Sequence, residues 1–88
     1  MKQYRVLLRK VAQKQLDDTS GKDNEVIQKT LHSLAENPRP FKLKKLTGSE
    51  LWRVRVGHFR IIFAINDDAE TITAVRITRR NEDTYNIG

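Results

Sequence analysis

The chain has 88 residues, of which 17 are basic and 11 acidic, so its formal net charge is +6. This length suits one domain with one small hydrophobic core, and we expect residues 1–88 to form a single domain. The sequence contains no cysteine and no apolar run of signal-peptide or membrane-spanning type, which excludes a disulfide framework and a Cys-ligated metal site and predicts a cytoplasmic protein.

The first 40 residues predict a strand followed by two helices. Gln3 to Leu8 alternates as a strand does, and residues 8–16 have apolar side chains at helical spacing. Polar residues 18–21 interrupt this pattern, and a second helix begins near Lys22. It ends before Pro38, because the residue that precedes a proline is disfavoured in helical geometry.

Residues 39–50 have the composition of a linker. Its lysines, Lys42, Lys44 and Lys45, are expected to reach water, and two interpretations stay open. They are ordinary solvated charges, or they are RNA- or ribosome-binding residues that contact phosphates and extend the arginine-rich segment that follows.

Residues 51–65 are the densest run of β-formers and predict two strands. The pair Gly57-His58 suits a two-residue type II′ turn, which places Arg55 opposite Arg60 and gathers both with Arg53 on one face. Like charges in this position destabilise a sheet by a few tenths to about 1 kcal/mol, a cost that an anionic ligand would reverse. The alternative is that the arginines are solvated edge charges that keep the sheet soluble.

A last strand is expected at Thr71–Thr78. Ile72 and Ala74 alternate with Val75 and Ile77, and both sets are apolar, which fits a strand buried on both faces. The whole order, β-α-α-β-β-β, predicts an α+β fold with a four-stranded, mainly antiparallel sheet. The helical hairpin packs on one face, and the opposite face stays open.

The charge is concentrated before and within the predicted β-hairpin. Residues 41–60 carry six basic and one acidic residue, whereas residues 61–88 carry three basic and five acidic ones. This distribution favours a polyanionic partner, with nucleic acid first and acidic protein or anionic membrane next.

Few enzyme templates fit these residues. A guanidinium cluster can hold a phosphate bidentately and stabilise the charge that builds on it in a transition state. It is a poor general base, because arginine stays protonated. The candidate proton acceptors are Tyr85, whose pKa nearby guanidiniums would lower from about 10, and His58, which is otherwise an ordinary exposed turn residue.

Four segments of the chain resemble the RelE/ParE toxins of bacterial and archaeal toxin–antitoxin pairs. They are Lys-Leu-Thr-Gly at 45–48, Leu-Trp-Arg-Val-Arg-Val-Gly at 51–57, Phe-Arg-Ile-Ile-Phe at 59–63 and Arg-Arg-Asn-Glu-Asp-Thr-Tyr at 79–85. The predicted order of elements matches too. The resemblance implies one of two activities, ribosome-dependent cleavage of messenger RNA in the RelE branch or poisoning of gyrase in the ParE branch.

The C-terminal segment is similar to the RelE branch, which implies an endoribonuclease that needs neither metal nor cofactor and cleaves messages in the ribosomal A site. A bound 2′-hydroxyl would attack the adjacent phosphate and leave a 2′,3′-cyclic end. In that family Arg60 would stabilise the phosphate, Arg79 would assist the leaving group or stabilise charge, and Tyr85 would be the base. Arg53 and Arg55 would hold the RNA backbone, where some members have lysines.

The resemblance also implies a cognate antitoxin, whose acidic or amphipathic segment wraps the toxin. Two other functions stay open from the sequence. One is a protein-binding inhibitor of gyrase, and the other is an RNA- or ribosome-binding module without chemistry.

Overall fold

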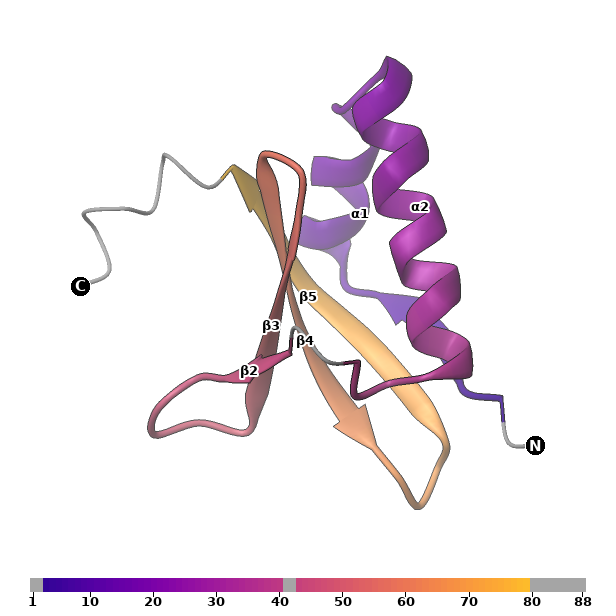
Figure 1. The fold of residues 1–88 in the computed structure, drawn as a ribbon, viewed down its shortest axis with the longest axis vertical. Coiled ribbons are helices and arrows are strands. Elements are labelled where there is room, and N and C mark those ends of the chain that lie inside the picture. The colour runs from indigo at the N-terminus through magenta and orange to yellow at the C-terminus, as the bar shows by residue number, and fades with distance from the viewer. Residues whose placement is uncertain (1–2, 41–42, 80–88) are drawn as a thin grey trace.

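The computed structural model describes residues 3–40 and 43–79, which fold into two helices against one sheet (Figure 1). In chain order the elements are β1 (Arg5–Leu8), α1 (Lys10–Asp17), α2 (Gly21–Glu36), β2 (Lys44–Lys45), β3 (Leu51–Val56), β4 (Phe59–Asn66) and β5 (Thr71–Arg79). The strand order across the sheet is β1-β5-β4-β3-β2, and both helices lie on the same face. The predicted α+β fold and the helical hairpin on one face are confirmed.

The sheet has one strand more than the four predicted. The additional strand, β2, belongs to the segment predicted as a linker, and its two residues pair antiparallel with Arg53 and Trp52 of β3. So short a strand has no alternation long enough to be detected in a sequence. At the other edge of the sheet β1 pairs in parallel with β5, whereas β3, β4 and β5 pair antiparallel, so the sheet is mainly antiparallel as predicted.

The hairpin of β3 and β4 has the predicted register. Val56 pairs with Phe59 and Arg55 pairs with Arg60, on either side of the loop at Gly57-His58. Gly57 has a φ of +58°, as the first loop position of a type II′ turn requires. The turn therefore determines which side chains of the two strands share a face.

Substituting Gly57 tests this turn. Gly57→Ala is expected to lower the free energy of unfolding by about 1–2 kcal/mol, because a β-carbon disfavours positive φ. A β-carbon built at Gly57 meets nothing within 4 Å among the described residues, so the loss comes from the backbone and not from a collision. Urea denaturation measures it. Gly57→Asn is the control and should lose less, since asparagine tolerates positive φ; equal losses would contradict this explanation.

The hydrophobic core lies between the helices and the sheet. The buried side chains that form it are Ala12, Leu16, Ile27, Leu31, Leu34, Val54, Val56, Phe59, Ile61, Phe63, Ile72, Ala74 and Ile77. The apolar side of each helix is only partly buried: Val11 of α1 is 50% exposed and Val26 of α2 is 41% exposed. Each helix covers the sheet with one side only, which leaves the margins of its apolar stripe in contact with water.

A β-bulge interrupts the pairing of β4 with β5. The register shifts between Ile62 and Phe63: Ile62 pairs with Arg76, Phe63 pairs with Ala74, and Val75 is the extra residue. An extra residue on one strand changes the phase of the alternation that follows it.

The bulge explains why both apolar sets of the last strand were compatible with the core. Ile72 lies before the bulge and Ile77 after it, and both are buried. Without the phase change they would point to opposite faces, because they are an odd number of residues apart. The expectation of a strand buried on both faces is therefore wrong. One face of the strand is buried, and the bulge keeps the apolar side chains on either side of it on that face.

Candidate nucleic-acid interface

The face of the sheet opposite the helices is basic. Residues paired across neighbouring strands share a face, so the registers place Arg53, Arg55 and Arg60 together, as predicted. Lys44 pairs with Arg53 and joins them, and so does Arg76, which pairs with Ile62. We refer to Lys44, Arg53, Arg55, Arg60 and Arg76 as the basic face.

The five cations of the basic face differ in exposure. Lys44, Arg55 and Arg76 are exposed, whereas Arg53 and Arg60 are half-buried, and the Nε atom of Arg60 is shielded from solvent. Arg55 and Arg60 lie directly opposite each other. Arginine does not lose its proton in proteins, so this pair keeps two like charges side by side.

No negative charge interrupts the described strands: none of β1 to β5 contains an aspartate or a glutamate. A surface that serves solubility alone normally mixes charges of both signs. The one-signed composition favours an anionic ligand over the alternative of solvated edge charges.

Arg79 is not brought together with these residues. It pairs with Phe59 on the helix side of the sheet, and its guanidinium carbon lies 5.3 Å from the centroid of the Phe59 ring. There it lines a cleft with Asp18 and Asp23, at the end of the helical hairpin. The reason is alternation: Arg79 is two residues after the buried Ile77, so both point the same way.

The three lysines of the predicted linker do not extend the arginine surface as a group. Lys44 does, but Lys45 pairs with Trp52 on the other face, and its Nζ atom is 5.7 Å from the centroid of the indole ring. Adjacent residues of a strand point to opposite faces, which separates the two. Lys42 lies outside the described residues.

Of the two candidate proton acceptors, the structure describes His58 but not Tyr85. His58 is exposed in the turn between β3 and β4. Tyr85, predicted as the catalytic base, lies outside the described residues.

Arg76 is the member of the basic face that sequence reasoning missed. Its position depends on the bulge at Val75, and a bulge leaves only a weak trace in a sequence. In this strand Ile72 and Ala74 alternate with Val75 and Ile77, and both pairs are apolar. This pattern fits a strand with a bulge as well as it fits a strand that is buried on both faces.

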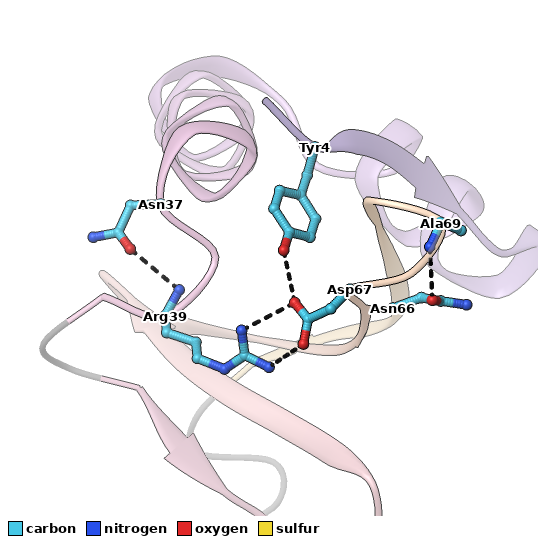
Figure 2. A network of polar contacts seen from close by, with 6 residues as sticks. All are labelled: Tyr4, Asn37, Arg39, Asn66, Asp67 and Ala69. Atoms are coloured by element: carbon cyan, nitrogen blue, oxygen red, sulfur yellow. Dashed lines mark hydrogen bonds and ion pairs between the residues drawn. The ribbon is translucent and has the colours of Figure 1, made fainter. Parts of the chain in front are cut away.

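A polar network joins three segments at the end of the sheet near the β4–β5 turn (Figure 2). Two guanidinium nitrogens of Arg39 donate to the Oδ1 and Oδ2 atoms of Asp67, at 3.2 and 3.0 Å, and the Tyr4 hydroxyl donates to Oδ1 at 2.6 Å. The guanidinium carbon of Arg39 also lies 5.7 Å from the centroid of the Trp52 ring. The network anchors the connection between α2 and β2, and hence the start of the segment that carries Lys44.

The network predicts an alkaline change in stability. The hydrogen bond to Asp67, followed by desolvation and the negative charge of Asp67, raises the pKa of Tyr4 above its ordinary value of 10.0. The folded state therefore holds the phenolic proton more tightly than the unfolded state does. This contribution is complete below a pH of about 10 and is lost as the pH rises through the folded-state pKa.

We accordingly expect Tyr4→Phe to unfold at a lower urea concentration than the wild type at neutral pH, with the difference disappearing once the wild-type phenol has ionised. Urea midpoints of both proteins across this pH range measure the effect. A difference that stays constant at all pH values would contradict the linkage.

Metal-binding groups and membrane-spanning helices are absent from residues 3–40 and 43–79. These residues contain no group of three or more His, Asp or Glu side chains that could hold a metal ion. Among the same residues, neither helix is both long and apolar enough to cross a membrane.

The arrangement of helices and sheet is that of RelE toxins. The structure of the archaeal RelE–RelB complex from Pyrococcus horikoshii OT3 has a TM-score of 0.79 and 26% identity, covering 89% of this chain and 96% of that one. The fold also matches the toxin–antitoxin complex RelBE2 from Mycobacterium tuberculosis, with a TM-score of 0.81 and 20% identity over 91% of this chain and 94% of that one.

Sequence comparison agrees with this fold. The family model described as the ParE toxin of the type II toxin–antitoxin system, parDE, matches residues 6–84. RelE1 of Methanocaldococcus jannaschii is 32% identical over 81 residues, which are 88% of this chain and 90% of the relative. The chain therefore belongs to the RelE/ParE family and is a toxin of a type II toxin–antitoxin system, which confirms the resemblance noted in the sequence.

Proposed function

We propose that this toxin is a ribosome-dependent endoribonuclease, which cleaves messenger RNA in the ribosomal A site and so inhibits translation in the cytoplasm. The observation that supports this most strongly is the basic face. It is left open by both helices, and no strand contributes a carboxylate to it. Guanidiniums hold phosphate oxygens in a fixed fork and stay charged at any physiological pH.

The proposed reaction uses the RNA itself as the nucleophile. The 2′-hydroxyl of the bound nucleotide attacks the adjacent phosphorus and gives its proton to a base, for which we propose Tyr85, with His58 as the alternative. The bond to the 5′-oxygen of the next nucleotide breaks, and that oxygen takes up a proton. The products are a 2′,3′-cyclic phosphate and a 5′-hydroxyl, and no metal or cofactor takes part.

In this proposal the cations of the basic face have separate tasks. Arg60 holds the scissile phosphate and stabilises the negative charge that builds on it. Arg53, Arg55 and Lys44 bind neighbouring phosphates of the message or the ribosome. We propose a phosphate contact for Lys42 as well, and for Lys45 a contact on the other side of the sheet, where it lies beside Trp52. A lysine phosphate contact strengthens binding without selecting a sequence.

Arg79 can assist the leaving group only if its side chain moves. The sheet separates it from Arg60, and its guanidinium lies over the Phe59 ring. Phe59 with Arg79 is the outermost described pair of β4 with β5, so opening this one pair would free the side chain. The role proposed for Arg79 therefore includes such an opening on RNA binding.

We further propose that a cognate antitoxin binds the protein. Relatives with this fold have been solved as RelE–RelB and RelBE2 complexes. An acidic antitoxin segment would suit the cationic face of the sheet, by strand addition. An amphipathic segment would suit apolar helix margins such as Val11 and Val26 on the other side of the sheet, as a helix in a groove.

Inhibition of gyrase is the second candidate function, and one observation favours it. The family model that matches the chain is described as a ParE toxin, and its match ends at residue 84, before the proposed base. Such a protein would act by binding protein, without RNA chemistry.

Cell-free translation of a defined message, followed by primer extension, separates these functions. We expect cleavage within the translated region, and we expect it to disappear when ribosomes are omitted. Intact messages together with stalled cleavage of supercoiled DNA by gyrase would support the second candidate instead. Inhibited translation with intact messages would mean that the protein binds the ribosome or RNA without chemistry.

A further inference from the structure

Arg76 lies on the basic face, outside the four segments in which the resemblance to the RelE/ParE toxins was noted. It pairs with Ile62 of β4, and Ile62 pairs with Arg53 of β3. Neighbouring strands are about 4.8 Å apart, so Arg76 and Arg53 flank Ile62 with their backbones about 10 Å from each other. The cationic surface therefore extends over a further strand, β5.

The β-bulge is what puts Arg76 there. In a regular strand without the bulge, Arg76 would point the same way as Ala74, which is fully buried against the helices. Bulges are frequent beside functional sites, where they redirect a side chain. Here the bulge keeps Ile77 in the core and directs Arg76 to the open face.

Arg76 has the environment of a ligand-binding residue and not of a structural one. Arg39 shows the structural case, because it is anchored by two hydrogen bonds to Asp67. Arg76 is exposed, and within residues 3–40 and 43–79 its side chain makes no hydrogen bond or ion pair. All five of its N–H donors can therefore face a ligand.

We propose that Arg76 binds a phosphate of the single-stranded RNA backbone beside the phosphate held by Arg60. This inference rests on the proposed function. Arg60 pairs with Thr78, and Arg76 lies two residues before Thr78 on β5. Such diagonal neighbours are about 7–8 Å apart, a distance that long side chains span, so the two guanidiniums can hold successive phosphates. Arg76 is a positioning residue, which sets the path of the RNA across β3, β4 and β5.

Salt-dependent binding of RNA tests this role. The probe is a single-stranded 2′-O-methyl RNA, which has no 2′-hydroxyl to react. In a plot of log affinity against log salt concentration, each phosphate contact contributes a slope of about 0.7 for single strands. We expect Arg76→Gln to reduce the slope by about that amount and to weaken binding roughly three- to tenfold at low salt. Arg76→Lys keeps the charge and should retain the slope.

The ribosomal assay gives a second readout. Because Arg76 positions the message and does not touch the reacting atoms, Arg76→Gln should raise KM and leave kcat unchanged. A fall in kcat at unchanged KM would overturn the positioning role.

Arg5→Gln is the matched control. Arg5 is an exposed arginine of β1 that pairs with Thr71, at the other end of β5, while its neighbour Val6 packs against the core, so Arg5 lies on the open side of the sheet. Its loss should leave the slope unchanged, and an equal reduction in both variants would overturn a specific contact at Arg76.

The remaining outcomes are distinct. If the wild type binds the RNA and cleaves messages while Arg76→Gln keeps its slope, the inference fails and the proposed function stands. If the wild type shows no salt-dependent RNA binding and no cleavage, both fail. If Arg76→Gln weakens a complex with the antitoxin and not with RNA, the residue serves a protein partner and the inference is wrong.

Discussion

Arg60→Ala is expected to slow message cleavage by about 10²–10³-fold, the usual effect of removing one preorganised donor that stabilises transition-state charge. Arg60 lies on β4, between Arg55 of β3 and Thr78 of β5. It is half-buried, with its Nε atom shielded from solvent, and in the proposed function it holds the scissile phosphate. Primer extension over a time course measures the rate.

Two further variants show whether the slower cleavage by Arg60→Ala comes from the loss of transition-state stabilisation. Arg60→Lys keeps the charge but not the planar fork, and its rate should fall between those of the wild type and Arg60→Ala. Arg5→Gln removes a guanidinium from the far end of the same side of the sheet and should cleave normally. If Arg60→Ala is folded, as judged by its urea midpoint, and still cleaves at nearly the wild-type rate, Arg60 has no catalytic role.

Phe63→Ala is expected to lower the free energy of unfolding by about 3–5 kcal/mol, the range for truncating a buried aromatic side chain. Phe63 is fully buried, and it lies on the central strand with Trp52 paired on one side and Ala74 on the other. Small domains have only about 5–15 kcal/mol of stability, so this loss would leave a marginal protein. Urea denaturation at low temperature measures it.

The neighbouring residue is a matched control for this substitution. Ile62 is half-buried on the opposite face of β4, between Arg53 and Arg76. Ile62→Ala should lower the free energy of unfolding by about 1–2 kcal/mol, because it removes less buried area. Equal losses for both variants would contradict the assignment of one face to the core and the other to ligand.

Sequence reasoning succeeded where local chemistry determines geometry. A two-residue loop that begins with Gly57 allows one register, and that register placed Arg53, Arg55 and Arg60 together. Pro38 likewise ended the second helix close to its observed last residue, Glu36.

Sequence reasoning failed where contacts between residues far apart in the chain determine the geometry. The bulge at Val75 arises from the need to bury Ile72 and Ile77 on the same side, and the sequence marks it only weakly, by two apolar sets in opposite phase. The change of phase moved Arg76 onto the basic face and Arg79 off it. The short strand β2 forms because β3 offers a free edge, and its pairing sends Lys45 to the side opposite Lys44.

The most direct test of a ligand-binding open face is an NMR titration of the wild type with the 2′-O-methyl RNA, following backbone amides and arginine Nε–Hε signals. The largest changes should occur at Arg53, Arg55 and Arg60, while exposed residues of α2 such as Lys29 stay unchanged. Changes that are concentrated on the helices, with the arginine signals of the basic face unmoved, would contradict the assignment of RNA binding to this face.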